Sequence, residues 1–99
     1  MDYQQQAKIF RFLGNPVRIQ ILTSLAHGPL CVSDLIRCIR HRQAYISQQL
    51  MVLRSIGWVL SEKEGWSVCY RLADTPETRW LKRVIGEIYP KLDCLDAPR

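Results

Sequence analysis

The chain has 99 residues, of which 47% are apolar, and a formal net charge of +5 at pH 7. This length suits one domain, and no apolar run approaches the roughly 18 residues that a membrane span needs. Residues 1–6 lack the basic cluster and apolar stretch of a secretory signal. We therefore expect residues 1–99 to form a single cytoplasmic domain with no membrane partner.

The first half of the chain is predicted to be helical. Gly14-Asn15-Pro16 separates two apolar stretches, because Asn caps helices and Pro suits a first helical turn. His27-Gly28-Pro29 ends the second helix, a basic turn follows the third, and Gly57 follows the fourth. The predicted helices cover residues 3–13, about 16–26, about 31–39 and about 43–56.

The hydrophobic period changes after Gly57. Residues 58–63 and 66–72 are rich in β-branched and aromatic residues, and only Glu64-Gly65 separates them, which predicts a two-residue β-hairpin. A last amphipathic helix is predicted at about 76–89, with Pro76 in its first turn.

The predicted fold is mainly α with a β-hairpin wing (α+β), a winged helix-turn-helix of order α-α-α-α-β-β-α. The helix-turn-helix covers about 31–57 and the wing about 58–72.

The charges are unevenly distributed. No acidic residue lies between Asp34 and Glu62, whereas four arginines do. The fourth helix is predicted to direct small and polar side chains outward, and the wing carries a lysine and a tryptophan near its tip. The candidate DNA-binding residues are Arg40, Arg42, Gln43, Ala44, Tyr45, Ser47, Gln48, Gln49, Arg54, Lys63 and Trp66.

These residue types suit double-stranded DNA. Glutamine pairs with adenine through two hydrogen bonds, serine donates or accepts, and alanine or tyrosine contacts a thymine methyl group. Arginines suit phosphates, and a wing lies along the backbone or in the minor groove. The combination of basic tract, helix spacing and wing predicts a sequence-specific DNA-binding protein.

Other interpretations remain open. The polar helix face and the arginines could be an ordinary solvated surface. The same fold could serve as a protein-interaction module without reading DNA, or bind double-stranded RNA or Z-form duplex through shape. An enzyme is not expected, because the sequence shows neither a combination of nucleophile and base nor a glycine-rich phosphate loop.

Several sequence blocks resemble the ArsR/SmtB repressors. These blocks are Leu13-Gly14-Asn15-Pro16-Val17-Arg18-Ile19-Gln20-Ile21-Leu22, Cys31-Val32-Ser33-Asp34-Leu35, Ser47-Gln48-Gln49-Leu50-Met51-Val52-Leu53-Arg54 and Tyr70-Arg71-Leu72. The resemblance extends from about Ile9 to Ile88. It implies a homodimer on an inverted repeat that leaves the DNA when an inducer binds.

The resemblance assigns dimerisation to the first and last helices, at about 3–13 and 76–89. Their apolar stripes also exceed what so small a core should need, which independently suggests a two-fold interface. The predicted interface residues are Ile9, Phe12, Leu81, Val84, Ile85 and Ile88.

The resemblance also raises the question of an inducer. Many members of the family bind metals or metalloids through a Cys-Val-Cys-Asp-Leu core, but here Ser33 replaces the second cysteine, and a hydroxyl is a poor ligand for a thiophilic ion. The family's other common site binds zinc through carboxylates and histidines on the last helix. Here both histidines, His27 and His41, lie in the first half of the chain, so this site is not expected. No cofactor is therefore required by the sequence.

A two-thiol site is still open. Cys31 could approach Cys94 of either subunit and bind a metalloid or metal ion, or form a reversible disulfide. Alternatively all four cysteines are free thiols that act as small hydrophobic residues, which is the expectation for a cytoplasmic protein.

Overall fold

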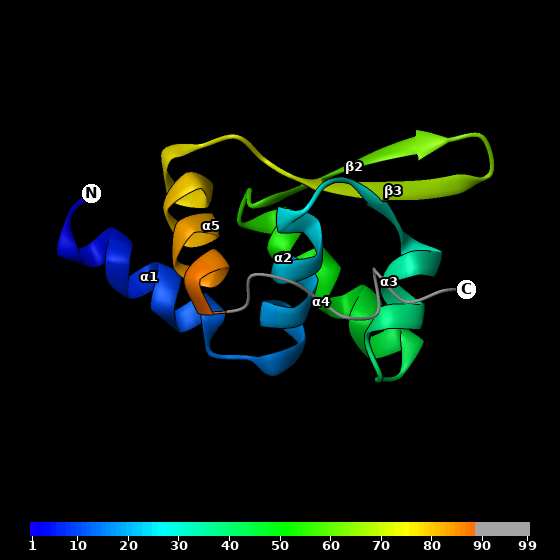
Figure 1. Cartoon of the computed structure of the whole chain (residues 1–99), viewed down its shortest axis with the longest axis horizontal. Helices are drawn as coiled ribbons and strands as arrows, with labels where there is room; N and C mark the ends of the chain where they lie inside the picture. The colour runs from blue at the N-terminus through cyan, green and yellow to red at the C-terminus, as the bar shows by residue number, and fades with distance from the viewer. Residues whose placement is uncertain (89–99) are drawn as a thin grey trace.

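A computed structural model of the protein describes residues 1–88 (Figure 1). Its elements in chain order are α1 (Tyr3–Leu13), α2 (Pro16–Ala26), β1 (Leu30–Cys31), α3 (Val32–Cys38), α4 (Gln43–Ser55), β2 (Val59–Glu64), β3 (Ser67–Leu72) and α5 (Pro76–Ile88). The predicted helices and hairpin are confirmed in the predicted order. The strand β1 is an addition that the sequence did not predict.

The first two helices begin at side-chain caps. In α1 the Asp2 carboxylate accepts the Gln5 amide at 2.8 Å, and the Gln5 side chain accepts the Asp2 amide at 2.9 Å. In α2 the Asn15 side chain accepts from the amides of Val17 and Arg18 at 2.9 and 3.1 Å. These bonds satisfy amides that have no partner within the helix, which explains why each helix starts where it does.

The strands form one antiparallel sheet in the order β1-β3-β2. Glu64 pairs with Ser67, so the two-residue loop is Gly65-Trp66, one position later than predicted. Gly65 has a φ of +61°, the left-handed region that the first loop position of a type II′ hairpin requires. Adding β1 makes the wing the outer part of a three-stranded sheet.

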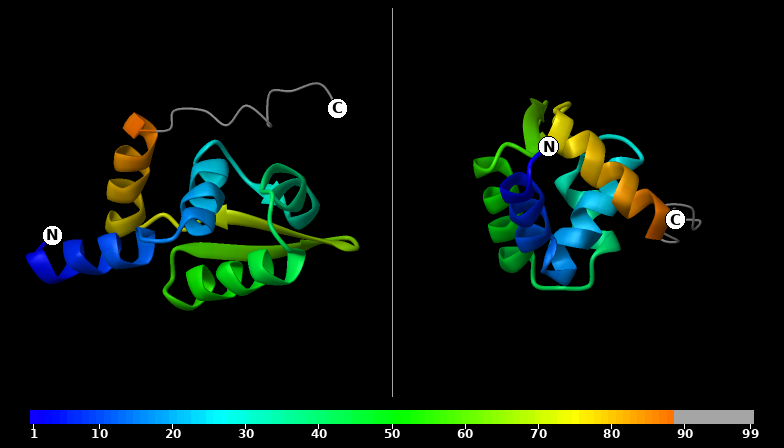
Figure 2. Two further views of the ribbon diagram at one scale, coloured as in Figure 1. Left: turned by 90° about the horizontal axis from the view of Figure 1, so that it is seen from below. Right: turned by 90° about the vertical axis from the view of Figure 1, so that its left-hand side faces the viewer.

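The molecule is elongated, with principal extents of 41 × 25 × 23 Å. Helices α1 and α5 lie at one end of the long axis and the hairpin tip at the other (Figures 1 and 2). One apolar core joins the helices to the base of the wing. It consists of Ile9, Val17, Ile21, Leu22, Leu25, Leu35, Ile39, Ile46, Leu50, Leu53, Trp58, Val59, Leu81 and Ile85.

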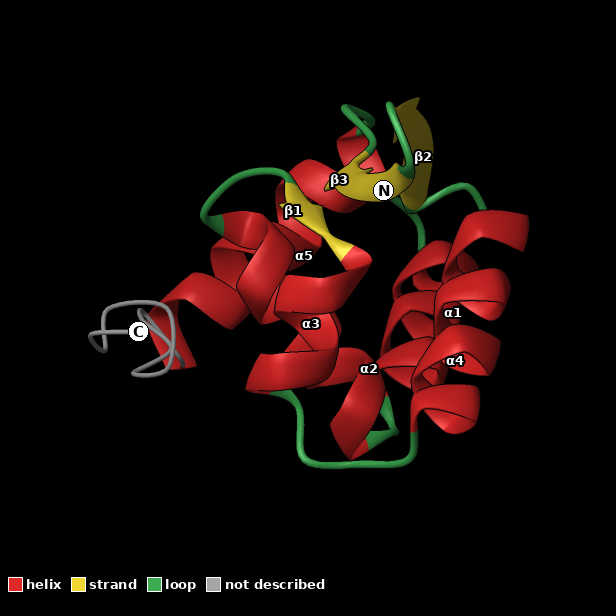
Figure 3. Cartoon of the chain, turned by 90° about the vertical axis from the view of Figure 1, so that its right-hand side faces the viewer, coloured by secondary structure: helices red, strands yellow, loops and turns green. Residues whose placement is uncertain are grey.

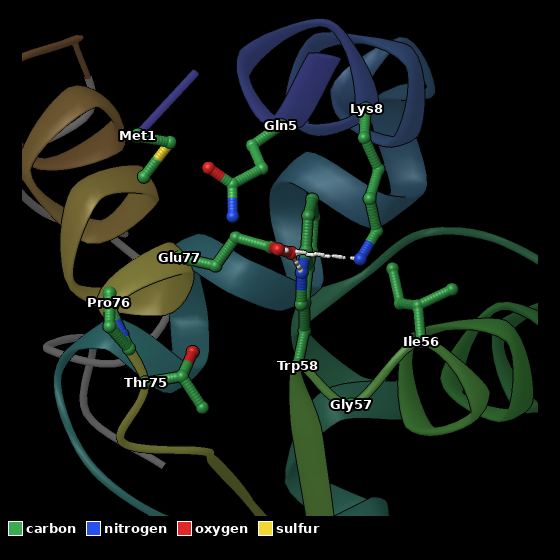
Figure 4. A pocket seen from close by; sticks show the side chains of 9 residues that line it. All are labelled: Met1, Gln5, Lys8, Ile56, Gly57, Trp58, Thr75, Pro76 and Glu77. Carbon is green, nitrogen blue, oxygen red and sulfur yellow. Dashed lines mark hydrogen bonds and ion pairs between the residues drawn. The ribbon is translucent and has the colours of Figure 1, made fainter. Parts of the chain in front are cut away.

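A polar cluster connects α1 and α5 with Trp58, the residue immediately before β2 (Figure 4). The buried Trp58 indole donates to the Glu77 carboxylate at 2.5 Å, and Lys8 Nζ lies 3.2 Å from the same oxygen. The indole hydrogen bond lowers the pKa of Glu77, burial opposes this, and Lys8 lowers it further. We call Lys8, Trp58 and Glu77 the junction cluster.

Candidate nucleic-acid interface

Helix α4 presents two different faces. Ile46, Leu50 and Leu53 are buried in the core, and the helix packs against α2 and β2. The opposite side is exposed and carries Ala44 and Gln48. The loop that leads from α3 into α4 lies on the side of the molecule away from the strands (Figure 3). The exposed residues of α4 are therefore accessible to a ligand.

Two side-chain hydrogen bonds from the start of α2 hold α4 in position. The Asn15 amide donates to the Tyr45 hydroxyl at 2.9 Å, and Arg18 Nε donates to the Gln49 amide oxygen at 2.7 Å. Asn15 also caps α2, so the same residue begins α2 and contacts α4. Helix α4 is therefore held by hydrogen bonds as well as by apolar packing.

The prediction that Gln49 faces outward is wrong, and Tyr45 is only partly exposed. Gln49 is only 7% exposed, because it lies between Ile46 and Leu53 on the inward stripe of α4. The Tyr45 ring is half-buried against the core and stacks on His41, with ring centroids 4.3 Å apart. Helical spacing alone indicated an inward Gln49, but its polar side chain favoured the surface.

The other predicted residues of this region are accessible. Ser47 is half-buried, and the remaining ones are exposed, namely Arg40, Arg42, Gln43, Ala44, Gln48 and Arg54. Within residues 1–88, the ion pairs involve other cations, on α1, α3, β3 and α5. Arginines that no described carboxylate neutralises can meet phosphates, so the basic flanks of α4 suit a nucleic-acid backbone.

The wing separates its charges between its two faces. Cross-strand register places Lys63 opposite Val68 on one face, and Glu62 opposite Cys69 on the other. Arg71 forms a salt bridge with Glu62, with 3.1 Å between Arg71 Nε and Glu62 Oε1. Trp66 is fully exposed at the tip. The hairpin therefore extends a cation and an aromatic ring away from the body.

The cysteines are arranged differently from the expectation of free thiols. Cys31 and Cys69 form a disulfide, because β1 places them directly opposite each other in the sheet. Cys94, the predicted partner of Cys31, lies outside the described residues. Among residues 1–88, no group of three or more His, Cys, Asp or Glu side chains could hold a metal ion.

Three of the six predicted dimer-interface residues are buried inside the chain. Ile9, Leu81 and Ile85 are 0–3% exposed in the core of a single chain and are not available to a partner. Phe12 and Val84 are half-buried, and the Ile88 side chain lies outside the described set. Among the described side chains, the large apolar ones exposed on α1 are aromatic, namely Tyr3 and Phe10. Phe10 packs edge-on against the half-buried Trp80 of α5, with ring centroids 5.7 Å apart.

A helix-turn-helix with an exposed polar helix, basic flanks and a hairpin wing defines a winged helix-turn-helix DNA-binding protein. No helix within residues 1–88 is long and apolar enough to cross a membrane. Residues 15–60 match the family model described as "Bacterial regulatory protein, arsR family".

The chain is 41% identical over 81 residues to the HTH-type transcriptional regulator NmtR of Mycobacterium tuberculosis, covering 82% of this chain and 68% of that protein. It belongs to the ArsR/SmtB family of transcriptional regulators, which confirms the sequence resemblance and the expectation that the protein is not an enzyme. The chain spans about half the length of the SmtB proteins that it also matches.

Solved structures confirm the fold. Reduced HlyU from Vibrio cholerae superposes with a TM-score of 0.78 at 27% identity, covering 89% of this chain and 92% of that one. The winged helix-turn-helix domain of Mb0332 from Mycobacterium bovis, described as homodimeric, has a TM-score of 0.71 at 29% identity, covering 86% of this chain and 78% of that one. The α+β winged-helix prediction is therefore correct.

Proposed function

We propose that the protein is a homodimeric repressor in the cytoplasm that binds an inverted repeat in duplex DNA. The observation that carries this proposal is the outer face of α4, where Ala44 and Gln48 are exposed between Arg42 and Arg54. Short polar and apolar side chains reach base edges, and flanking cations contact phosphates. This division of roles is what a recognition helix in the major groove needs.

The structure supports a smaller reading set than the sequence predicted. Gln48, Ala44 and Ser47 read bases in this proposal. Tyr45 and Gln49 position the helix, because their polar atoms already bond to Asn15 and Arg18. The backbone contacts are assigned to Arg40, Arg42, Gln43 and Arg54, with Lys63 and Trp66 acting from the wing.

The homodimer is proposed from the end of the molecule that lies opposite the wing tip. Tyr3 and Phe10 are 88% and 58% exposed there, and large exposed aromatic side chains are typical of interfaces. The related Mb0332 domain is described as homodimeric. A two-fold axis through α1 and α5 presents two equal α4 helices, so the operator is an inverted repeat.

The proposed inducer is a thiophilic metalloid or metal ion that binds Cys31. Because Cys31 is bonded to Cys69 in this structure, such an inducer requires the reduced pair. Fluorescence anisotropy of reduced protein on duplex, with and without arsenite, tests this directly. Release from DNA that is lost in Cys31→Ser supports the inducer, and an unchanged response removes Cys31 from sensing.

The proposed reading role of Gln48 is tested on duplex from the protein's own promoter against scrambled duplex over a salt series. Gln48→Ala should weaken specific binding by about 1–3 kcal/mol, because one pair of base-edge hydrogen bonds is lost. Binding to scrambled duplex should not change. Gln4→Ala, an exposed glutamine substitution on α1, is the matched control and should leave both affinities as they are.

The alternative function is a protein-interaction module with the same fold. Sequence-selective binding by the unmodified protein excludes it. Equal affinity for promoter and scrambled duplex at every salt concentration would contradict the repressor and favour that alternative.

A further inference from the structure

The Cys31–Cys69 pair lies where the helix-turn-helix meets the wing. Cys31 is the last residue of β1 and immediately precedes α3, whereas Cys69 is in the middle of β3. Their Cα atoms are 3.8 Å apart in register, and the two residues are 38 positions apart in the chain. The bond therefore connects the start of the helix-turn-helix covalently to a strand of the wing.

Without this bond, β1 is a weak attachment. It has two residues, and its register with β3 consists of Leu30 opposite Tyr70 and Cys31 opposite Cys69. β1 is also an edge strand of the sheet, and so short a ladder contributes little stability by itself. The disulfide is thus the only covalent link across this junction among the described residues.

The two cysteine residues differ in exposure to solvent. Cys69 is 8% exposed, whereas Cys31 is half-buried at the sheet edge. Disulfides are uncommon in the cytoplasm and those that form there are usually transient. We propose that Cys31 and Cys69 are a reversible thiol–disulfide site that fastens the wing to the helix-turn-helix, with a low-molecular-weight disulfide as the oxidising partner.

The reaction proceeds in two exchanges. The Cys31 thiolate, the more accessible of the two, attacks one sulfur of the small disulfide and releases one small thiolate. The Cys69 thiolate then attacks the Cys31 sulfur of the mixed disulfide and releases the second. Two protein thiols become one disulfide, the small disulfide becomes two thiols, and the two protein protons end on those thiols. Excess small thiol reverses both steps.

The consequence for DNA binding rests on the proposed function. In the bonded form the base of the wing is fixed, while α3, α4 and the β2–β3 register are intact. In the reduced form the covalent link is absent, and the wing is held at this edge by the two-residue ladder and by the packing of α2 and α3 against β3. The base of the wing is then less constrained, so DNA binding must also order it. Ordering costs of this kind are about 0.5–1.5 kcal/mol per immobilised group, so the oxidised protein should bind roughly two- to tenfold more tightly.

The chemistry is tested first without DNA. Reduced full-length protein is incubated with glutathione disulfide, and the products are identified by non-reducing peptide mapping and mass spectrometry. We expect an intramolecular Cys31–Cys69 peptide pair that excess glutathione removes. A dominant Cys31–Cys94 bond, a disulfide between chains, or no disulfide at all would overturn the proposal.

Duplex affinity is then compared between the reduced and oxidised states by anisotropy. The two- to tenfold difference should vanish in Cys31→Ser and in Cys69→Ser, and persist in Cys38→Ser, the matched control. Cys69→Ala provides an apolar alternative if serine at this buried position prevents folding.

If the peptide pair forms but neither state binds duplex, the repressor assignment fails and the thiol site stands. If both states bind duplex equally, the proposed fastening of the wing is wrong.

Discussion

Helix α4 and the wing face the same proposed duplex but are supported in different ways. Ile46, Leu50 and Leu53 bury α4 in the core, and two side-chain hydrogen bonds from α2 hold it. The outer half of the hairpin is exposed on both faces, from Glu62 to Val68. Its attachment lies at its base, in β1 and the junction cluster.

This difference separates two tasks. Reading base edges requires side chains held within a fraction of an ångström, which suits a helix anchored in a packed core. Neutralising phosphates tolerates movement, because the electrostatic attraction is less directional. The rigid element therefore suits sequence recognition, and the extended element suits affinity.

The largest expected effect comes from removing a core contact of α4. Leu50→Ala should lower the free energy of unfolding by about 2–5 kcal/mol, because it leaves a cavity beneath the helix. Val68→Ala on the wing should change it by no more than about 0.5 kcal/mol. Urea unfolding monitored by circular dichroism measures both. Similar losses in the two variants would mean that the wing is as firmly packed as α4.

A smaller effect is expected from the wing lysine. Lys63→Ala should weaken binding to promoter and scrambled duplex equally, and lower the slope of log affinity against log salt by about 0.9 for one lost phosphate contact. Lys82→Ala, an exposed lysine change on α5, should leave the slope unaltered. If Lys63→Ala impaired only promoter binding, the wing would read sequence and the division of tasks would be wrong.

The smallest effect concerns the junction cluster, which joins α1 and α5 to Trp58 at the base of the wing. Because the pKa of Glu77 is lowered from 4.5, mainly by the Trp58 hydrogen bond, its contribution to stability is present above that value and is lost as pH falls through the lowered pKa. Unfolding free energies from neutral pH downward should show Glu77→Gln least stable relative to wild type at neutral pH, with the gap closing below about 4.5.

The exposed Glu62→Gln provides the comparison for this titration, since Glu62 lies on the wing and its salt bridge is with Arg71. A gap between wild type and Glu77→Gln that stayed constant with pH would show that the carboxylate charge contributes nothing at the junction.

Strong local signals made much of the fold predictable. Gly14, Asn15 and Pro16 determined where α1 ends and α2 begins, and the change of hydrophobic period after Gly57 located the hairpin. β1 could not be found this way, because two residues carry no periodicity and its partner lies 38 positions away. The disulfide escaped prediction for the same reason.

The errors in the site have a related cause. Amphipathic spacing shows that α1 and α5 each have an apolar face, but not whether this face meets the same chain or another one. Ile9 and Leu81 turned out to be covered within the chain. Gln49 was misplaced because a polar side chain is expected at the surface, and the residue that satisfies it, Arg18, lies 31 positions earlier in the chain.

The exposed Trp66 has a consequence for how this protein can diverge. Its ring is fully accessible at a turn whose backbone geometry is set by Gly65. Replacing it removes no packed neighbour, so a lineage can exchange this side chain without lowering the population of folded molecules. The wing tip is therefore a position at which natural or laboratory selection can adjust the proposed contact with DNA while the rest of the domain stays unchanged.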